Sequence, residues 1–250
     1  METAPLLKVS QLYKNFGGVQ AIQNLNFELA EGELLGLIGP NGSGKTTAVN
    51  LITGFVKPTE GEIAYRGKNI TGRAPYKIVR MGIARTFQMV KPFYQLPAYK
   101  NMIIPLYSPR VKKRIGGKFG DRDAVALDLL EEVGFERDSY VAYKPASVLP
   151  QGYLKRLELA KAIALDPDLI ILDELFSGLS LAEVASIVPI IEKLRQEGKT
   201  IIMIEHRLKE LFRIADRIIV LNFGEKIADG KAAEVMQSDA VKSAYLGSEV

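Results

Sequence analysis

The stretch Gly39-Pro40-Asn41-Gly42-Ser43-Gly44-Lys45-Thr46 decides the fold, because it matches the pattern G-x-x-x-x-G-K-[ST] in full. The apolar run Leu34–Ile38 before it predicts a buried strand, and Thr46–Thr53 after it predicts a helix. A glycine turn that binds nothing would rarely have both flanks. In this setting the backbone N–H groups curl around phosphates, and the helix N-terminus adds its positive dipole end. We therefore expect a phosphate-binding loop here.

Side chains at the end of this loop complete the expected nucleotide site. Lys45 supplies a point charge to the β- and γ-phosphates, and the Thr46 hydroxyl is expected to ligate Mg²⁺. Thr47 follows directly and is counted with the loop. The sequence thus predicts ATP and Mg²⁺ as the bound groups.

Two acids follow a second apolar run, Leu169–Leu172. A buried parallel strand places its C-terminal residues at the ligand edge of a sheet. There Asp173 can hold Mg²⁺ through water, and Glu174 can act as general base toward the attacking water. A strand that simply meets solvent would explain the acids alone, but the phosphate loop favours the catalytic interpretation.

Two more polar residues are candidates for contact with the γ-phosphate. His206, the single histidine, directly follows the predicted strand Thr200–Ile204 and Glu205. It is in place to orient the attacking water, against the alternative of a structural histidine. Gln88 ends the first α/β segment and is in place to sense Mg²⁺ and the γ-phosphate; a surface glutamine is the alternative.

The composition of the 250-residue chain excludes several kinds of site. It has no cysteine and one histidine, which excludes disulfides, thiolate metal sites and histidine-cluster metal sites. The net charge is only +4, so no nucleic-acid partner is expected, and we interpret the basic run between Arg110 and Lys118 as a solvated loop. We see no signal peptide and no run long enough to span a membrane, and expect a soluble or peripheral cytoplasmic protein.

The pattern of strand-like and helix-like stretches along the sequence predicts an α/β fold of two parts. Residues 1–88 and 164–250 read as a P-loop NTPase core: a mixed sheet flanked by helices, an N-terminal antiparallel β part and a C-terminal helical tail. Residues 89–163, rich in prolines and aromatics at first and then in helical patterns, read as a helical subdomain.

With these pieces in order, the chain resembles the ATP-binding subunits of ABC transporters over essentially its whole length. The resemblance implies an adenine-stacking aromatic at Phe16 and a glutamine loop at Thr86–Gln88. It also implies an interface loop at Ser177–Ser180 and a switch histidine at His206. Three stretches look like the branched-chain amino acid importer branch: Ile52–Phe55, Gly82–Gln88 and Ala244–Gly247. Urea, amide and other amino-acid importers have similar subunits.

The resemblance also implies partners and a mechanism. Two such subunits sandwich two ATP molecules, each between one phosphate loop and the other chain's signature segment. We expect a homologous ATPase subunit, in a heterodimer or a homodimer, and permease subunits docked near 89–101 at the cytoplasmic face of the inner or plasma membrane. The expected function is ATP hydrolysis coupled to import of a small polar solute. Among such solutes, the resemblance favours branched-chain or related amino acids.

The signature segment departs from the family pattern Leu-Ser-Gly-Gly-Gln. This chain has Leu149-Pro150-Gln151-Gly152-Tyr153, which lacks the serine hydroxyl and one backbone N–H. Either the ATP site completed by this segment is weakened, or this branch tolerates the variation; we favour the second. A hydroxyl bond to a charged phosphate is worth about 1.5–3 kcal/mol, so its loss slows a site rather than abolishes it.

Two other functions remain open from the sequence. One is a soluble ABC protein acting on nucleic acid or ribosomes, although such proteins usually have tandem cassettes or coiled-coil insertions. The other is a weakly hydrolysing, nucleotide-gated regulatory subunit, which the altered signature allows.

Overall fold

The computed structural model describes residues 4–114 and 121–246, so Lys118 of the basic run and Gly247 of the branch motif lie outside the described residues. The chain forms two compact units. The first comprises Met1–Ile78 and Gly198–Val250, and the second comprises Val79–Glu197. No helix within the two described ranges is long and apolar enough to cross a membrane.

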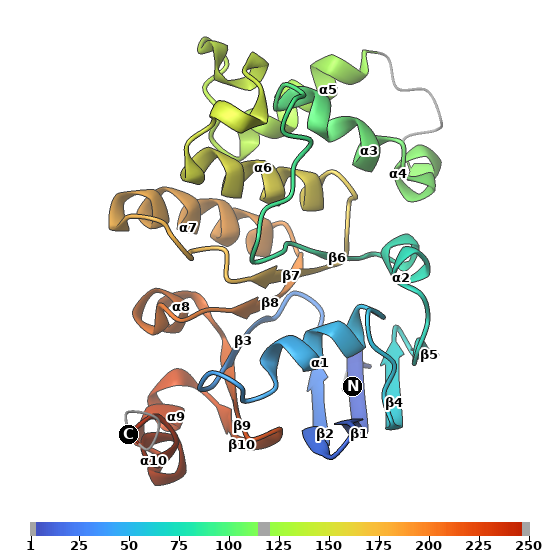
Figure 1. Cartoon of the computed structure of the whole chain (residues 1–250), viewed down its shortest axis with the longest axis vertical. Coiled ribbons are helices and arrows are strands. Elements are labelled where there is room, and N and C mark those ends of the chain that lie inside the picture. The colour runs from blue at the N-terminus through green and yellow to red at the C-terminus, as the bar shows by residue number, and fades with distance from the viewer. Residues whose placement is uncertain (1–3, 115–120, 247–250) are drawn as a thin grey trace. The chain divides into compact units, whose positions relative to one another are not determined.

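The first unit contains a four-stranded antiparallel sheet in the order β2-β1-β4-β5 (Figure 1). Its strands are β1 (Leu7–Phe16), β2 (Val19–Leu29), β4 (Glu60–Tyr65) and β5 (Lys68–Asn69). Buried residues such as Leu7, Val9 and Leu12 line one face of β1, and a bulge at Gln11 shifts the register between them. These strands match the predicted N-terminal antiparallel part.

A second sheet in the first unit places the phosphate loop. β3 (Leu34–Ile38) lies between the parallel strands β8 (Thr200–Ile204) and β9 (Arg217–Asn222), and β10 (Glu225–Gly230) pairs antiparallel with β9. All residues of β3 and β8 are buried, as expected for parallel strands covered on both faces. The unit's helices are α1 (Lys45–Ile52), α8 (Leu208–Ile214), α9 (Ala232–Gln237) and α10 (Asp239–Leu246).

The second unit pairs β6 (Ile83–Arg85) in parallel with β7 (Leu169–Asp173). Its helices are α3 (Ile103–Leu106), α4 (Pro109–Arg114), α5 (Arg122–Glu132), α6 (Gln151–Ile163) and α7 (Leu181–Gln196). Short 3-10 turns lie at Tyr99–Met102, Tyr140–Tyr143 and Ala146–Val148, and α2 (Pro75–Met81) lies where the chain passes from one unit to the other.

Local chemistry explains where two of these helices begin. The Asp121 carboxylate caps α5 by accepting hydrogen bonds from the N–H groups of Asp123 and Ala124. Ser180 and Glu183 form a capping box at the start of α7. The compact unit 79–197 is wider than the predicted helical subdomain 89–163, since it also holds β6, β7 and α7. The functional division at 89–163 stays a prediction.

Candidate functional site

The phosphate loop has the backbone that its glycines predict. Gly39, Gly42 and Gly44 have positive φ angles of 149°, 78° and 104°. A Cβ on Gly39 would lie 2.1 Å from the Leu221 carbonyl oxygen, and one on Gly44 would lie 2.7 Å from that of Ala21. Both positions therefore require glycine, because the loop packs directly against the backbones of β9 and β2.

Lys45 and Ser43 give the loop a donor set that suits phosphate. The buried Lys45 ammonium donates to the carbonyl oxygens of Gly39 at 2.7 Å and Pro40 at 2.9 Å, so its charge is held across the loop. Within the described part of the chain, the buried Ser43 hydroxyl makes no hydrogen bond. A buried hydroxyl without a partner costs about 1–3 kcal/mol, and a phosphate oxygen would be a suitable partner. Thr46 is exposed and Thr47 is half-buried at the start of α1.

The turn between β9 and β10 ties the loop to β2. Gly224 donates its N–H to the Ser43 carbonyl at 3.0 Å, and Gln23 donates its side-chain amide to the Phe223 carbonyl at 3.0 Å. Phe223 has a positive φ of 46°, which is uncommon for a bulky residue. The turn is thus held in a strained conformation by contacts on both sides of it.

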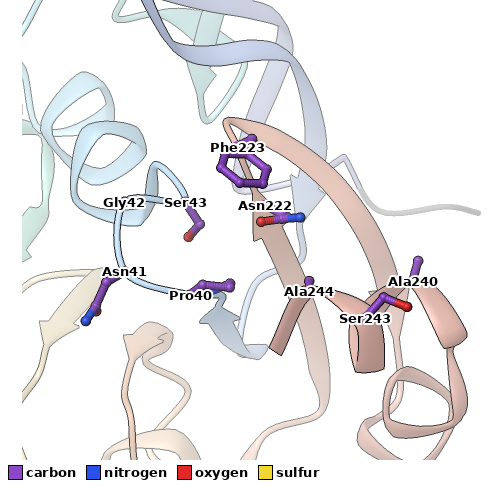
Figure 2. Close-up of a pocket in the computed structure, with 9 residues that line it drawn as sticks. All are labelled: Pro40, Asn41, Gly42, Ser43, Asn222, Phe223, Ala240, Ser243 and Ala244. Carbon is purple, nitrogen blue, oxygen red and sulfur yellow. The ribbon is translucent and has the colours of Figure 1, made fainter. Parts of the chain in front are cut away.

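A pocket of about 290 Å³ borders the loop on the side of this turn and α10. Figure 2 shows the phosphate loop on one side of it and the turn and α10 on the other. It is lined by Pro40, Asn41, Gly42, Ser43, Asn222, Phe223, Ala240, Ser243 and Ala244. Next to it, the Gly39 backbone hydrogen-bonds the Tyr245 hydroxyl; burial raises the pKa of Tyr245, against a smaller lowering by that bond. The helical tail therefore contacts the first residue of the loop.

Phe16 and His206 also belong to the first unit. Phe16 ends β1 with 47% of its surface exposed, and the Lys14 ammonium lies 4.8 Å from its ring centroid. His206 is exposed and closely follows β8, whereas its neighbour Glu205 is buried. Because β3 and β8 are parallel, the phosphate loop and His206 lie at the same edge of their sheet. This is the arrangement that the strand pattern predicts.

Asp173 lies in the second unit and is held on two sides. It ends β7, and its carboxylate accepts a hydrogen bond from Arg85 Nη2 at 2.6 Å, with both side chains almost fully buried. Its backbone N–H donates to the Thr86 hydroxyl at 3.1 Å. A buried pair of this kind fixes geometry, because losing either partner would leave an uncompensated charge.

Glu174 and Gln88 contact each other directly. Gln88 Nε2 donates to Glu174 Oε2 at 2.6 Å, and Glu174 has a positive φ of 49°. The buried Lys155 ammonium donates to the backbone carbonyls of Gln88 at 3.0 Å and Glu174 at 2.9 Å. The structure thus brings Gln88, Asp173 and Glu174 together in the second unit, while Phe16, the phosphate loop and His206 lie in the first.

The signature segment begins α6. Pro150 is the N-cap residue, with φ −56° and ψ 156°, and the helix starts at Gln151. A Cβ on the buried Gly152 would lie 2.4 Å from Glu183 Oε1, which takes part in the α7 capping box. Pro150 and Gln151 are exposed, and Leu149 is buried.

Tyr153, which ends the signature segment, is bound within its own unit. Its hydroxyl donates to Glu136 at 3.3 Å, and its ring meets Phe135 edge-on at 5.0 Å between centroids. Burial raises the pKa of Tyr153, and the nearby Glu136 carboxylate raises it further.

The oxygen donors predicted for the metal are chemically suitable for Mg²⁺. Thr46, Asp173 and Gln88 offer a hydroxyl, a carboxylate and an amide oxygen, and Mg²⁺ normally keeps several waters beside one or two carboxylates. Within 4–114 and 121–246, no cluster of three or more His, Cys, Asp or Glu side chains could hold a metal by itself.

Sequence reasoning missed three residues that support the site: Arg85, Lys155 and Tyr245. One signal could have indicated Lys155. Gly152, Lys155, Leu159 and Ala162 recur at spacings of three and four and are all buried. A lysine on the apolar stripe of a helix is unusual enough to suggest a buried hydrogen-bonding role.

Comparison with known families gives two matches. A family model described as "ABC transporter" matches residues 22–177, and one described as "Branched-chain amino acid ATP-binding cassette transporter" matches residues 225–250.

Curated relatives match nearly the whole chain. The "High-affinity branched-chain amino acid transport ATP-binding protein" BraF of Pseudomonas aeruginosa is 36% identical, covering 97% of this chain and 98% of the relative. The protein of the same description named LivG, from Escherichia coli K12, is 37% identical with the same coverage. A "Probable branched-chain amino acid transport ATP-binding protein" LivG of Archaeoglobus fulgidus is 31% identical over 98% of the chain and 96% of the relative.

Solved structures also match nearly the whole chain. An ATP-binding cassette of an ABC transporter is 28% identical with a TM-score of 0.85, covering 97% of this chain and 99% of that one. The ADP conformation of an ATP-binding cassette is 29% identical with a TM-score of 0.83, covering 98% and 100%. These likenesses confirm the predicted P-loop ATPase fold.

Proposed function

Because the chain belongs to the ABC transporter family of ATP-binding proteins, we propose that it is the ATP-hydrolysing subunit of an importer for branched-chain or related amino acids. One observation supports this cargo most directly. Relatives that match 97% of the chain are described as high-affinity branched-chain amino acid transport ATP-binding proteins. The separate branched-chain family match at 225–250 agrees with it.

The residues of the first unit bind the nucleotide in this proposal. The backbone N–H groups of Gly39–Thr46, the Lys45 ammonium and the hydroxyls of Thr46 and Thr47 hold the phosphates of ATP. Phe16 stacks on the adenine through its half-exposed ring. Thr46, Asp173 and Gln88 hold Mg²⁺, which, when bound, neutralises charge that develops on the phosphates.

Hydrolysis uses carboxylate and imidazole side chains in this proposal. Glu174 accepts the proton of the attacking water, and Gln88, whose amide contacts Glu174 at 2.6 Å, fixes the direction of that carboxylate. His206 donates a hydrogen bond to the γ-phosphate. Arg85 holds the Asp173 carboxylate in place by a charge-assisted hydrogen bond of 2.6 Å.

A second ATPase subunit completes each site in this proposal. Leu149–Tyr153 faces the partner's nucleotide through its exposed residues Pro150 and Gln151 and through the N-terminus of α6. We infer a heterodimer, in which a homologous partner supplies the other half-site; a homodimer is the alternative.

Permease subunits dock near 89–101, on the helical subdomain 89–163 of the proposed division. Met89, Phe93, Tyr94 and Leu96 are exposed there. The segment is preformed, because the buried Asn101 side chain accepts from the Phe93 N–H at 2.7 Å and donates to the Pro97 carbonyl at 3.0 Å. An apolar surface of fixed shape suits a membrane partner and a peripheral location at the inner face of the membrane.

The test is transport by the reconstituted complex. Proteoliposomes with the permeases, the binding protein and this chain are expected to hydrolyse ATP and to accumulate leucine, isoleucine or valine. Uptake of urea or of unrelated amino acids alone would contradict the cargo. A wild-type complex that turns over no faster than its Glu174→Gln variant would contradict hydrolysis and favour a regulatory subunit.

A further inference from the structure

Lys155 is a buried residue that connects α6 with Gln88 and Glu174. It lies on α6 and is only 1% exposed, although an ammonium group is costly to bury unless its donors are used. Its Nζ donates to the backbone carbonyls of Gln88 at 3.0 Å and Glu174 at 2.9 Å. One side chain of α6 therefore contacts both residues proposed for the hydrolytic step.

The two carbonyls come from segments that the β6–β7 pairing and the Arg85–Asp173 ion pair already place side by side, and Lys155 contacts the residues that follow these links. Gln88 is 67 positions from Lys155, and Glu174 is 19 positions from it. Glu174 has a left-handed backbone, a conformation that costs about 1–3 kcal/mol and persists only where its surroundings enforce it. The Lys155 hydrogen bond is one such constraint, and the 2.6 Å contact between the two side chains is another.

Lys155 is also joined to the signature segment. α6 begins at Gln151, so Pro150 and Lys155 are separated by little more than one helical turn. The start of α6 lies against the cap of α7, because a Cβ on Gly152 would lie 2.4 Å from Glu183 Oε1. We expect a displacement of Pro150 or Gln151 to move the start of α6, and Lys155 with it, because all of them belong to one helix and its cap.

We propose that Lys155 is a positioning residue that couples the signature segment Leu149–Tyr153 to Gln88 and Glu174 of the same chain. The proposal rests on the proposed function, because the signature segment must touch the nucleotide of a second subunit. That contact sets the position of α6. Because Lys155 moves with α6, the contact also shifts the carboxylate of Glu174, which acts on the ATP bound by the same chain. The two ATP sites of the assembly then communicate through one ammonium in each such chain.

The first test is steady-state ATP turnover of the reconstituted complex with Lys155→Met, which keeps the length of the side chain and removes its donors. We expect kcat to fall about ten- to a hundredfold, the size expected for losing hydrogen bonds from a charged group, and KM for ATP to stay within about twofold. Lys155→Arg should recover part of kcat.

Lys161→Met is the matched control. Lys161 lies on the same helix but is 22% exposed and pairs with Glu158 at 2.9 Å, away from Gln88 and Glu174. Its kcat should equal the wild-type value. Equal kcat for Lys155→Met and Lys161→Met, or a loss of ATP affinity in place of kcat, would overturn the role of Lys155.

The coupling itself is tested by a double-mutant cycle with Pro150→Ser, which restores a hydroxyl at the signature position. We expect Pro150→Ser to change kcat in the wild-type background and to have little effect beside Lys155→Met. The same fold-change in both backgrounds would mean that Lys155 does not transmit the state of the signature segment.

Hydrogen exchange separates failure of this inference from failure of the proposed function. Amide exchange around Gln88 and Glu174 should speed up in the Lys155→Met complex and stay unchanged in Lys161→Met, whether or not ATP is hydrolysed. If even the wild-type complex lacks turnover, the proposed function fails, and exchange alone decides on Lys155. Unchanged exchange in Lys155→Met would then overturn the inference.

Discussion

The phosphate loop and the signature segment, with the start of α6 that follows it, are held in shape in different ways. In the loop, backbone geometry is decisive, because Gly39 and Gly44 press against carbonyl oxygens and tolerate no Cβ. In the signature segment and the start of α6, side chains hold the structure. Tyr153 contacts Glu136, and Lys155 contacts Gln88 and Glu174. A backbone-defined site admits few residues, whereas a site held by side chains can change its residues when the neighbours compensate. The loop matches its motif in full, and the signature segment does not.

The largest expected effect tests whether the second unit contributes chemistry or only structure. Glu174→Gln keeps the size of the side chain and removes the base, so turnover in the reconstituted complex should fall about 10²–10⁴-fold. ATP binding, measured with a fluorescent ATP analogue, should be unchanged, because the phosphate loop belongs to the first unit. A joint loss of binding and turnover would show that the two regions are not separable in this way.

The next effect tests how far the second unit depends on paired side chains. Arg85→Met leaves the Asp173 carboxylate buried without its 2.6 Å partner, which should lower the free energy of unfolding by about 3–5 kcal/mol. Denaturant unfolding measures this directly. Arg137→Met removes a cation whose ion pairs with Asp128 and Glu131 are half-exposed, and should leave stability nearly unchanged. Equal effects of the two substitutions would contradict the importance of the buried pair.

A glycine substitution tests whether the backbone geometry of the phosphate loop requires glycine. Gly39→Ala places a Cβ 2.1 Å from the Leu221 carbonyl and requires a left-handed φ, so it should cost about 1–3 kcal/mol and weaken nucleotide binding at least as strongly. Gly18→Ala is the control, because no atom lies within 4 Å of its added Cβ. Isothermal titration with ATP and thermal unfolding measure both effects. Wild-type affinity of the Gly39→Ala variant for ATP would show that the loop does not require glycine at this position.

The smallest effect asks whether side chains also matter to the loop. Tyr245→Phe removes the hydroxyl that hydrogen-bonds the Gly39 backbone, so ATP affinity should fall by about 0.5–1.5 kcal/mol, or two- to tenfold. Tyr140→Phe, at a residue that is 82% exposed, should change nothing. An effect above tenfold would mean that the loop depends on its tail contact more than on its glycines.

The parts that the sequence predicts well are those set by neighbours in the chain. The loop, its flanking strand and helix, Asp173 at the end of β7 and Glu174 directly after it follow from local patterns. Arg85 and Lys155 could not be assigned in the same way, because Arg85 meets Asp173 across 88 positions and Lys155 meets Gln88 across 67. The functional division at 89–163 and the group that Pro150 would contact in a second subunit likewise could not be predicted. Both depend on how the chain assembles with other subunits, and local sequence patterns do not describe that assembly.

The turn at Phe223-Gly224 has a consequence for synthesis of the protein. Gln23 meets Phe223 across 200 positions, and the same turn supports Ser43 in the phosphate loop. A ribosome adds about 5–20 residues per second, so the emerging loop waits on the order of ten seconds for this support. We therefore expect the loop to gain its folded shape, and with it its affinity for ATP, only after nearly all of the first unit has been synthesised.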